Sequence, residues 1–306
     1  MRGTLIKKWK KWNQKNTRGE KIFDVVNLFV LVFIGFVSLY PFWQIVAESF
    51  NEPLDAMRGG IYFFPRKFSL IAYKTVFAND TLLTSFFVSV ARTLAGTFVS
   101  IVVTALLAYA LSKPFLAGRK VYSLLCLATM FFSGGMIPTY LIISRLGLID
   151  NFLVFILPSA VNVWNMIILR TFFENIPVSL EESAKLDGAG WYRIFFTITL
   201  PLSGSAIATV CLFFAVAQWS AWFDAYIYIL DARHLYPMQT ILMRIINQNA
   251  ITGGDIVGGN VGGTITVTAD AIKLATIVVS TVPILCVYPF VQKYFVQGIL
   301  IGSVKG

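Results

Sequence analysis

Six long apolar runs are the feature of this chain that most restricts how it can fold. A helix needs about 20 apolar residues to cross a hydrocarbon layer of roughly 30 Å. Hydrophobic residues make up 57% of the 306 residues and charged residues 13%, whereas about a quarter of an ordinary soluble domain is charged. The sequence therefore predicts an all-α membrane protein. Its six transmembrane helices are expected near 25–47, 86–111, 121–143, 152–173, 202–230 and 271–291.

The distribution of lysine and arginine predicts the orientation of these helices. Cytoplasmic loops of membrane proteins retain an excess of both residues. The N-terminal arm, residues 1–24, is strongly basic, and the short loop 112–120 is basic as well. We therefore expect a multi-pass protein of the cytoplasmic membrane whose N- and C-termini, together with loops 112–120 and 174–200, lie in the cytoplasm. The loops expected outside are 48–85, 144–151 and 231–270.

The chain divides into the basic arm, residues 1–24, and one six-helix membrane domain, residues 25–306. Trp9 and Trp12 lie among the lysines of the arm. Basic and aromatic residues together can bind nucleic acid, but beside a transmembrane helix they are typical of an interfacial segment on anionic lipid. We expect membrane lipid and no nucleic acid as its partner. The first span begins late and lacks an obvious cleavage site, so we expect it to remain as an anchor.

Catalytic and metal chemistry are not indicated. His234 is the single histidine, and we expect it in an external loop without a nucleophile signature nearby. Cys126, Cys211 and Cys286 fall in separate predicted spans, so neither a disulfide framework nor a metal site is expected. Three glycine pairs within 231–270 lack the flanking strand, helix and lysine of a phosphate-binding loop. The sequence predicts a protein that is not an enzyme.

Two of the predicted spans contain signs of close or irregular packing. The third is interrupted by the segment 133–138, Ser-Gly-Gly-Met-Ile-Pro, which frees backbone groups and predicts a kink. The second carries small residues at helical spacing, and such residues let helices approach closely. These small residues are Ser85, Ser89, Thr93, Gly96, Ser100 and Thr104.

Polar residues at membrane depth are the candidates for a substrate path. An ionisable group there is a functional candidate unless it pairs locally or extends to the interface. Tryptophan rings can cover the apolar face of a sugar, while amides and a carboxylate bond its hydroxyl groups. The same residues could instead form aromatic belts and interhelical hydrogen bonds. The candidates are Arg92, Asn162, Trp164, Asn165, Gln218, Trp219, Trp222 and Asp224.

A polar helix-turn-helix signal lies between the fourth and fifth spans. Ser179 is expected at the N-cap of a short helix, with Glu182 three residues later completing a capping box. Gly188 is suited to end this helix near Leu186, because glycine adopts a left-handed conformation without penalty. A second helix is expected from about Trp191 to the start of the fifth span. Glu182 would then cap its own helix and need no other partner, or it would contact another protein.

The same loop resembles the "EAA" loop of ABC importer permeases. That motif reads Glu-Ala-Ala, three residues, Gly, nine residues, Ile-x-Leu-Pro, and here it begins at Glu182 and ends at Pro201. Ser183 in place of the middle alanine is the single departure. Segments 132–140, 219–224 and 297–306 also resemble the LplC/YtcP-like branch of type I carbohydrate-uptake permeases. The resemblance covers nearly the whole chain.

This resemblance implies a type I ABC importer permease fold with a cytoplasmic coupling-helix loop at about 174–200. It implies two related permeases, a cytoplasmic ATPase dimer that binds ATP and Mg, and an extracellular substrate-binding lipoprotein. The chain lacks a phosphate-binding loop, so no cofactor is expected in it. It would translocate a sugar or oligosaccharide. The residues that would couple it to the ATPase are Ser179, Glu182, Ser183, Ala184, Asp187, Gly188 and Ala189, with the two alanines permitting close approach.

Two other transport functions remain open at this level. A secondary transporter driven by an ion gradient would use membrane carboxylates such as Asp224 or Asp270, although six spans without a visible inverted repeat argue against it. An ABC permease for a non-sugar solute, such as a peptide, would share every feature above. A membrane-embedded enzyme or structural anchor is a third class, for which no convergent catalytic groups are found.

Overall fold

The computed structural model describes residues 17–252, 260–261, 264–265 and 267–303. Most of the basic arm and all three glycine pairs of segment 231–270 lie outside these residues. The same holds for the last residues of the 297–306 tail, which contributed to the family resemblance.

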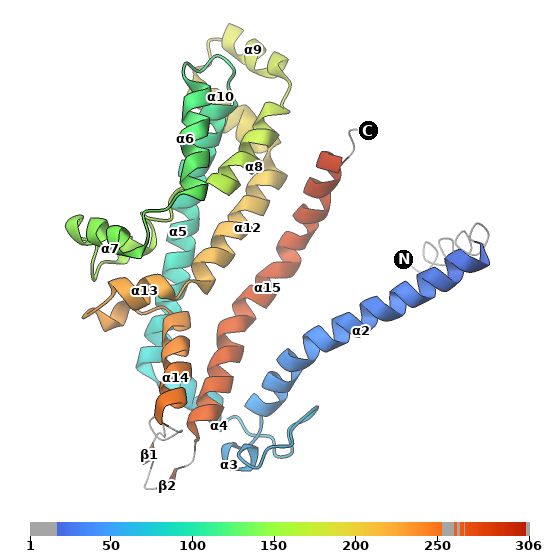
Figure 1. Ribbon diagram of the computed structural model, residues 1–306, viewed down its shortest axis with the longest axis vertical. Coiled ribbons are helices and arrows are strands. Elements are labelled where there is room, and N and C mark those ends of the chain that lie inside the picture. The colour runs from blue at the N-terminus through green and yellow to red at the C-terminus, as the bar shows by residue number, and fades with distance from the viewer. Residues whose placement is uncertain (1–16, 253–259, 262–263, 266, 304–306) are drawn as a thin grey trace.

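Three continuous helices are long and apolar enough to cross a membrane. Helix α2 begins with a capping box, in which Thr17 accepts a hydrogen bond from the Glu20 amide and the Glu20 carboxylate accepts one from the Thr17 amide. This helix is largely exposed, and it diverges from the rest of the protein (Figure 1). The three helices are α2 (Arg18–Ser49), α5 (Asp80–Ser112) and α15 (Ala269–Ser303).

Two further candidate spans are bent pairs of helices. Helices α6 (Arg119–Phe131) and α7 (Met136–Arg145) meet at an angle of 115°. The predicted interruption at 133–138 is confirmed in position, but the chain turns far more sharply than a kink. Gly135 has a φ of 84° at this turn, a conformation that glycine adopts most readily.

The other bent pair covers the first part of the predicted fifth span. Helix α11 (Leu200–Leu202) and the elements before it meet helix α12 (Gly204–Ser220) at 87°. Helix α12 ends ten residues before the predicted limit of the span at 230, and a separate helix α13 (Phe223–Tyr228) follows. One continuous helix over 202–230 is therefore wrong, because the backbone leaves the helical conformation at Ala221–Trp222.

The fourth predicted span, 152–173, is an α-helix only in its second half. This segment contains a short 3₁₀ turn, η1 (Phe152–Phe155), irregular chain and helix α8 (Val163–Glu174). Twelve residues are too few to cross a bilayer as a helix. Pro158 lacks an amide donor, and helix α8 instead starts where Asn162 caps it. The structure describes three long spanning helices, or five when each bent pair is one span, so the count of six stays a prediction.

Short elements lie at both ends of the molecule (Figure 1). Helices α9 and α10 lie at the upper end, and α3, α4 and the strand pair β1–β2 lie at the lower end. The strands pair antiparallel. The bounds are α3 (Pro53–Ala56), α4 (Ile71–Ala78), α9 (Val178–Leu186), α10 (Trp191–Ile194), the π-helical turn η2 (Phe195–Thr199), η3 (Arg233–Leu235), α14 (Met238–Thr252), β1 (Asn260–Val261) and β2 (Thr264–Ile265).

Helix α5 is the centre of the fold and packs against α8, α12 and α14. Its small residues Ser85, Ser89, Gly96, Ser100 and Thr104 are buried, as the sequence predicted for a close-packed face. A Cβ atom at Gly96 would lie 2.6 Å from the side chain of Gln218 on α12. The two helices can therefore approach this closely only because residue 96 has no side chain.

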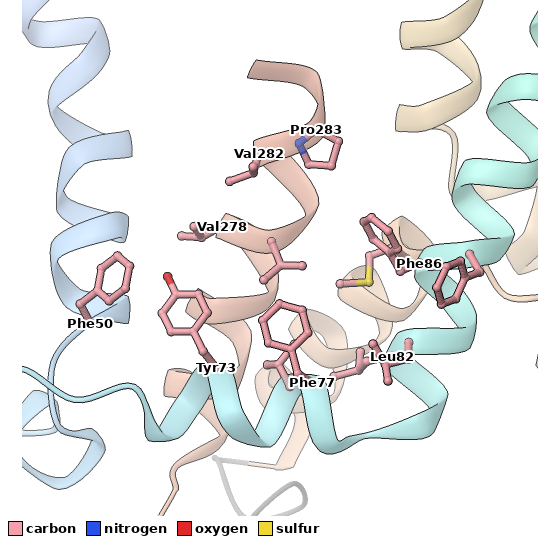
Figure 2. A pocket seen from close by; sticks show the side chains of 13 residues that line it. Phe50, Tyr73, Phe77, Leu82, Phe86, Val278, Val282 and Pro283 are labelled. Atoms are coloured by element: carbon pink, nitrogen blue, oxygen red, sulfur yellow. The ribbon is translucent and has the colours of Figure 1, made fainter. Parts of the chain in front are cut away.

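The lower end of the molecule holds an apolar cavity of about 570 Å³ between α2, α4, α5 and α15 (Figure 2). Phe50, at the end of α2, stacks on Tyr73 of α4 with ring centroids 4.8 Å apart. Ser49 and the Tyr73 hydroxyl are joined by a hydrogen bond of 2.7 Å. Helix α2 is thus fastened to the rest of the protein near its C-terminal end.

Candidate functional site

Helix α9 of the polar loop begins earlier than the sequence suggested. Pro177 occupies the N-cap, Val178 is the first helical residue and Ser179 lies inside the first turn, without a side-chain cap. The capping box of Ser179 and Glu182 is therefore wrong. The φ of Pro177 is −57°, so the proline already has the φ of a helix and the helix starts directly after it.

The C-terminal end of α9 is a Schellman motif, with Gly188 in the left-handed conformation at a φ of 81°. The amide of Ala189 donates to the carbonyl of Ala184 at 2.9 Å, and the amide of Gly188 donates to the carbonyl of Lys185 at 2.9 Å. These two bonds satisfy carbonyl groups that the helix end leaves unpaired. The predicted roles of Gly188 as helix terminator and Trp191 as the start of α10 are both confirmed.

Ala184 and Ala189 point toward the protein's own interior. Both are half-buried and pack against the core that α5, α8 and α12 share. A hydrophobic contact between these two positions usually accompanies a Schellman motif. The two alanines therefore fit the turn against the protein's own core, and their contact with another protein stays a prediction.

The two glutamates of α9 lie in different environments. Glu181 is buried, and its carboxylate pairs with the ammonium group of Lys113, the residue that follows α5. The same ammonium lies 4.3 Å from the ring centroid of Tyr109. Glu182 is exposed and has no hydrogen-bond or ion-pair partner within the part of the chain that the structure describes. Sequence reasoning singled out Glu182 and missed Glu181, although Lys113 is the first residue after the long α5 run.

Lys185 forms a second contact between α9 and its surroundings. Its ammonium lies 3.5 Å from the ring centroid of Trp191 and 5.1 Å from that of Phe115. The two rings stack at 4.9 Å. Lys185 follows Glu181 by four residues, and residues at this spacing lie on the same side of a helix. One face of α9 thus contacts segment 113–115.

The opposite face of α9 is open to solvent. Glu182, Ser183 and Asp187 are exposed, as is Ser179 in the first turn. Leu186 is 90% exposed, so this face carries an apolar side chain beside its polar ones. Four of the predicted coupling residues therefore share a free surface, whereas the two alanines and Gly188 form the turn beneath it.

A second polar cluster surrounds Arg92 at the middle of the fold. The Arg92 side chain is buried, and all three of its nitrogen atoms donate hydrogen bonds. Nη2 donates to Asp224 Oδ2 at 2.6 Å and to Gln218 Oε1 at 3.2 Å, and Nη1 donates to the carbonyl of Ala221 at 3.2 Å. The guanidinium also lies 4.4 Å from the ring centroid of Phe155. Of the two readings of Arg92, local pairing is confirmed.

Arg92 stabilises the break between α12 and α13. Ala221 lies at that break, so its carbonyl cannot bond within a helix, and Asp224 belongs to the first turn of α13. Gln218 extends the cluster by donating to the carbonyl of Phe155 at 3.1 Å and to Ser159 Oγ at 2.8 Å. The cluster therefore joins α5, α12, α13 and the irregular segment before α8.

The remaining candidates for the substrate path are of two kinds. Some cap a helix or are buried, and the others are exposed or partly exposed. Asn162 caps α8 by accepting a hydrogen bond from the Asn165 amide at 2.9 Å. Trp219 is buried and donates to the carbonyl of Ser280 at 2.9 Å. Asn165 is buried, whereas Trp164 is 61% exposed. Trp222 and Asp224 are partly exposed.

Metal chemistry has no support in the described residues, since no group of three histidine, cysteine or acidic side chains could hold an ion there. The three cysteines are free. An ion-pair network that sequence reasoning missed joins α6 and α8, where Arg119 and Arg170 both pair with Glu174. The spacing of Arg170 and Glu174, four residues along one helix, is a signal that could have revealed part of it.

Similarity to individual known proteins identifies the family of this chain, although no known family profile matches it. The protein LplC of Bacillus subtilis is 43% identical over 293 residues, which is 95% of this chain and 97% of LplC. The polygalacturonan/rhamnogalacturonan transport system permease protein YtcP of Bacillus subtilis is 43% identical over 286 residues, 94% of this chain and 99% of YtcP.

A solved structure shares both the fold and the sequence pattern. A chain of a bacterial ABC transporter involved in the import of the acidic polysaccharide alginate superimposes with a TM-score of 0.82 at 31% identity, covering 92% of this chain and 99% of that one. These matches cover nearly the full length of this chain and of its relatives. The chain belongs to the family of permease subunits of ABC carbohydrate importers.

Proposed function

We propose that this chain forms half of the membrane pathway through which an ABC importer carries oligosaccharides of acidic polysaccharides into the cell. The observation that supports it is the near full-length similarity to a permease for polygalacturonan and rhamnogalacturonan and to a transporter for alginate. More distant relatives, at 25–27% identity, include permeases for lactose and for trehalose and maltose. Neutral oligosaccharides are therefore the second candidate substrate.

The proposed complex contains a second related permease, two cytoplasmic ATPases and an external substrate-binding lipoprotein. A second solved structure is that of a bacterial alginate ABC transporter in complex with an alginate pentasaccharide-bound periplasmic protein. A chain of it matches at 14% identity with a TM-score of 0.55, and this likeness carries the fold alone. ATP and Mg would bind to the ATPases, because the permease supplies no phosphate-binding loop. Both termini and α9 would face the cytoplasm.

The open face of α9 is our candidate for the ATPase contact. It combines an exposed carboxylate, Glu182, with an exposed apolar side chain, Leu186. A surface of this composition fits a groove with an apolar floor and a basic rim. The substitution Glu182→Lys should leave the membrane helices assembled but reduce import per ATP hydrolysed. If this variant imported as much substrate per ATP hydrolysed as the wild type, the coupling role of Glu182 would be contradicted.

Trp222 and Asp224 are our candidates for sugar contacts along the path. Both are partly exposed beside the α12–α13 break, so a ring face and a carboxylate edge are within reach of a ligand. Arg92, Gln218 and Trp219 would instead hold this break in place, because their side chains are buried and bonded within the protein. The Asp224 side chain is also bonded to Arg92 but is 27% exposed. Trp164 is an open aromatic side chain on α8 and a further candidate.

Uptake by the whole complex tests the substrate. The tagged chain would be purified from its own host with its copurifying subunits, reconstituted in vesicles with its binding protein, and supplied with ATP. We expect import of galacturonate oligosaccharides or alginate pentasaccharide, and slower import of lactose or maltose. Import of lactose or maltose without import of the acidic oligosaccharides would instead favour neutral oligosaccharides as the substrate.

The pairing of Asp224 counts against the ion-gradient alternative. Asp224 is paired at 2.6 Å with the buried Arg92, which leaves this carboxylate less charge to offer a coupling ion. Asp270 pairs with Lys273 at 2.7 Å, but its side chain is 73% exposed and this pair restrains it little. Uptake that persists without ATP but stops when the ion gradient is dissipated would restore this alternative.

A further inference from the structure

Two contacts fasten the coupling helix α9 to the same short segment at the end of α5. Glu181 pairs with Lys113, and Lys185 lies over the stacked rings of Phe115 and Trp191. The two α9 residues are four positions apart, and their partners on the α5 side are two positions apart. A helix held at two points one turn apart resists rotation as well as separation.

The environment of the first contact makes it sensitive to loss of either charge. Lys113 and Glu181 are each 8% exposed. A buried charge that loses its partner is strongly unfavourable, whereas an exposed ion pair contributes little. The Tyr109 ring 4.3 Å from the Lys113 ammonium further limits where that group can move.

Helix α5 connects this contact to the middle of the membrane domain. Arg92 and Lys113 are 21 positions apart, and the helix is continuous between them, so they are separated by about 30 Å along its axis. Arg92 in turn holds the α12–α13 break through Ala221 and Asp224. A displacement of α9 would therefore reach the break through one rigid helix.

We propose that Glu181 and Lys185 clamp α9 to the C-terminal end of α5, so that the coupling helix and α5 move as one body during the ATP cycle. This inference rests on the proposed function, because it assigns a mechanical role to the helix that would contact the ATPase. Glu181, Lys185 and Lys113 are positioning residues. They would not touch substrate or nucleotide.

The first test compares import with ATP hydrolysis in the reconstituted complex. Glu181→Gln and Lys113→Gln should each lower the number of oligosaccharides imported per ATP by five-fold or more, with ATP hydrolysis retained. The charge-exchanged variant Lys113→Glu/Glu181→Lys should recover at least half of the wild-type ratio. Lys120→Gln is the matched control, since Lys120 is an exposed lysine of the same region, and it should leave the ratio unchanged.

A second test needs no transported substrate. Spin labels at Val178→Cys on α9, an exposed position outside the proposed ATPase contact, and at Ala117→Cys near the end of α5 would report the distance between these two elements. The labelled protein would lack the three native cysteines. We expect the distance distribution to stay the same when ATP and vanadate are added, and to broaden in Glu181→Gln. Labels on the two ATPases should move in the same samples.

The outcomes separate this inference from the proposed function. A nucleotide-dependent change in the α9–α5 distance of the wild-type complex would overturn the clamp, as would Glu181→Gln and Lys113→Gln variants with the wild-type import ratio. Absence of a copurifying ATPase, or of any ATP-driven import by the wild-type complex, would instead overturn the proposed function.

Discussion

Arg92 Nη2 and Asp224 Oδ2 are joined by an ion pair of 2.6 Å between residues 132 positions apart. The arginine side chain is 2% exposed and the aspartate side chain 27%. A guanidinium has five donor hydrogens, and it makes hydrogen bonds here to Gln218, Ala221 and Asp224. This pair fixes the place where α12 ends and α13 begins.

Removal of Arg92 should destabilise the membrane domain substantially. In Arg92→Met the carbonyl of Ala221 loses its donor and the carboxylate of Asp224 keeps only the Ala225 amide. A broken buried ion pair costs about 3–5 kcal/mol. The apparent Tm of the detergent-solubilised protein should fall clearly below that of Arg193→Met, a control at an exposed arginine. The double variant Arg92→Met/Asp224→Leu should be more stable than Arg92→Met. Equal Tm values for Arg92→Met and Arg193→Met would contradict this role.

A side chain at position 96 should separate α5 from α12. The Cβ of Gly96→Ala would lie 2.6 Å from Gln218, whose amide is bonded at both ends and cannot move aside. Overpacking of this kind costs about 1–3 kcal/mol. Gly35→Ala is the matched control, because a Cβ there meets nothing within 4 Å. Thermal unfolding of both variants should show a loss for Gly96→Ala alone.

The turn after α9 should depend on Gly188 and not on Gly190. Gly188 has a φ of 81°, whereas Gly190 has a φ of −74°, and neither has a neighbour within 4 Å of an added Cβ. Gly188→Ala should therefore cost about 1 kcal/mol through backbone strain alone. Hydrogen exchange of the amides at 188 and 189 should accelerate in Gly188→Ala. Equal acceleration in Gly190→Ala would show that strain is not the cause.

Acidic pH should weaken the hydrogen bonds between the Asp150 carboxylate and the amides of residues 230–232. Its carboxylate accepts hydrogen bonds from the amides of Ala232, Leu230 and Asp231, and these bonds, that of Ala232 foremost, lower the pKa of Asp150 below its usual value. A depressed pKa in the folded state gives stability that is fully present above the unfolded pKa of about 3.9. This stability is lost as the pH falls through the lower folded value.

Hydrogen exchange across this pH range measures the effect. Protection of the amides at 230–232, corrected for intrinsic exchange, should decline as the solution becomes more acidic than about pH 4. Asp150→Asn retains a residue that tolerates the observed φ of 54° but removes the titrating group. Protection in that variant should be lower and independent of pH over the same range, and an unchanged pH dependence would exclude Asp150 as its source.

The apolar runs and the turn chemistry were readable from the sequence because they depend on neighbours along the chain. Gly188 ends α9 and Trp191 starts α10 as predicted, since a left-handed turn favours glycine wherever it occurs. The small-residue face of α5 and the interruption at 133–138 were found for the same reason. Membrane location follows from composition alone, because lipid is the solvent that such a chain requires.

Only the tertiary structure decided which polar residues are free and which are paired. Glu181 and Glu182 are adjacent and chemically identical, yet one meets Lys113 across 68 positions of sequence and the other faces solvent. Arg92 has no partner near it in the sequence, and its burial is compensated by Asp224 on a distant element. Helix orientation sets these contacts through packing. The periodicity of the sequence therefore determined where helices form, while the packing of these helices determined which charged side chains are paired and which face solvent.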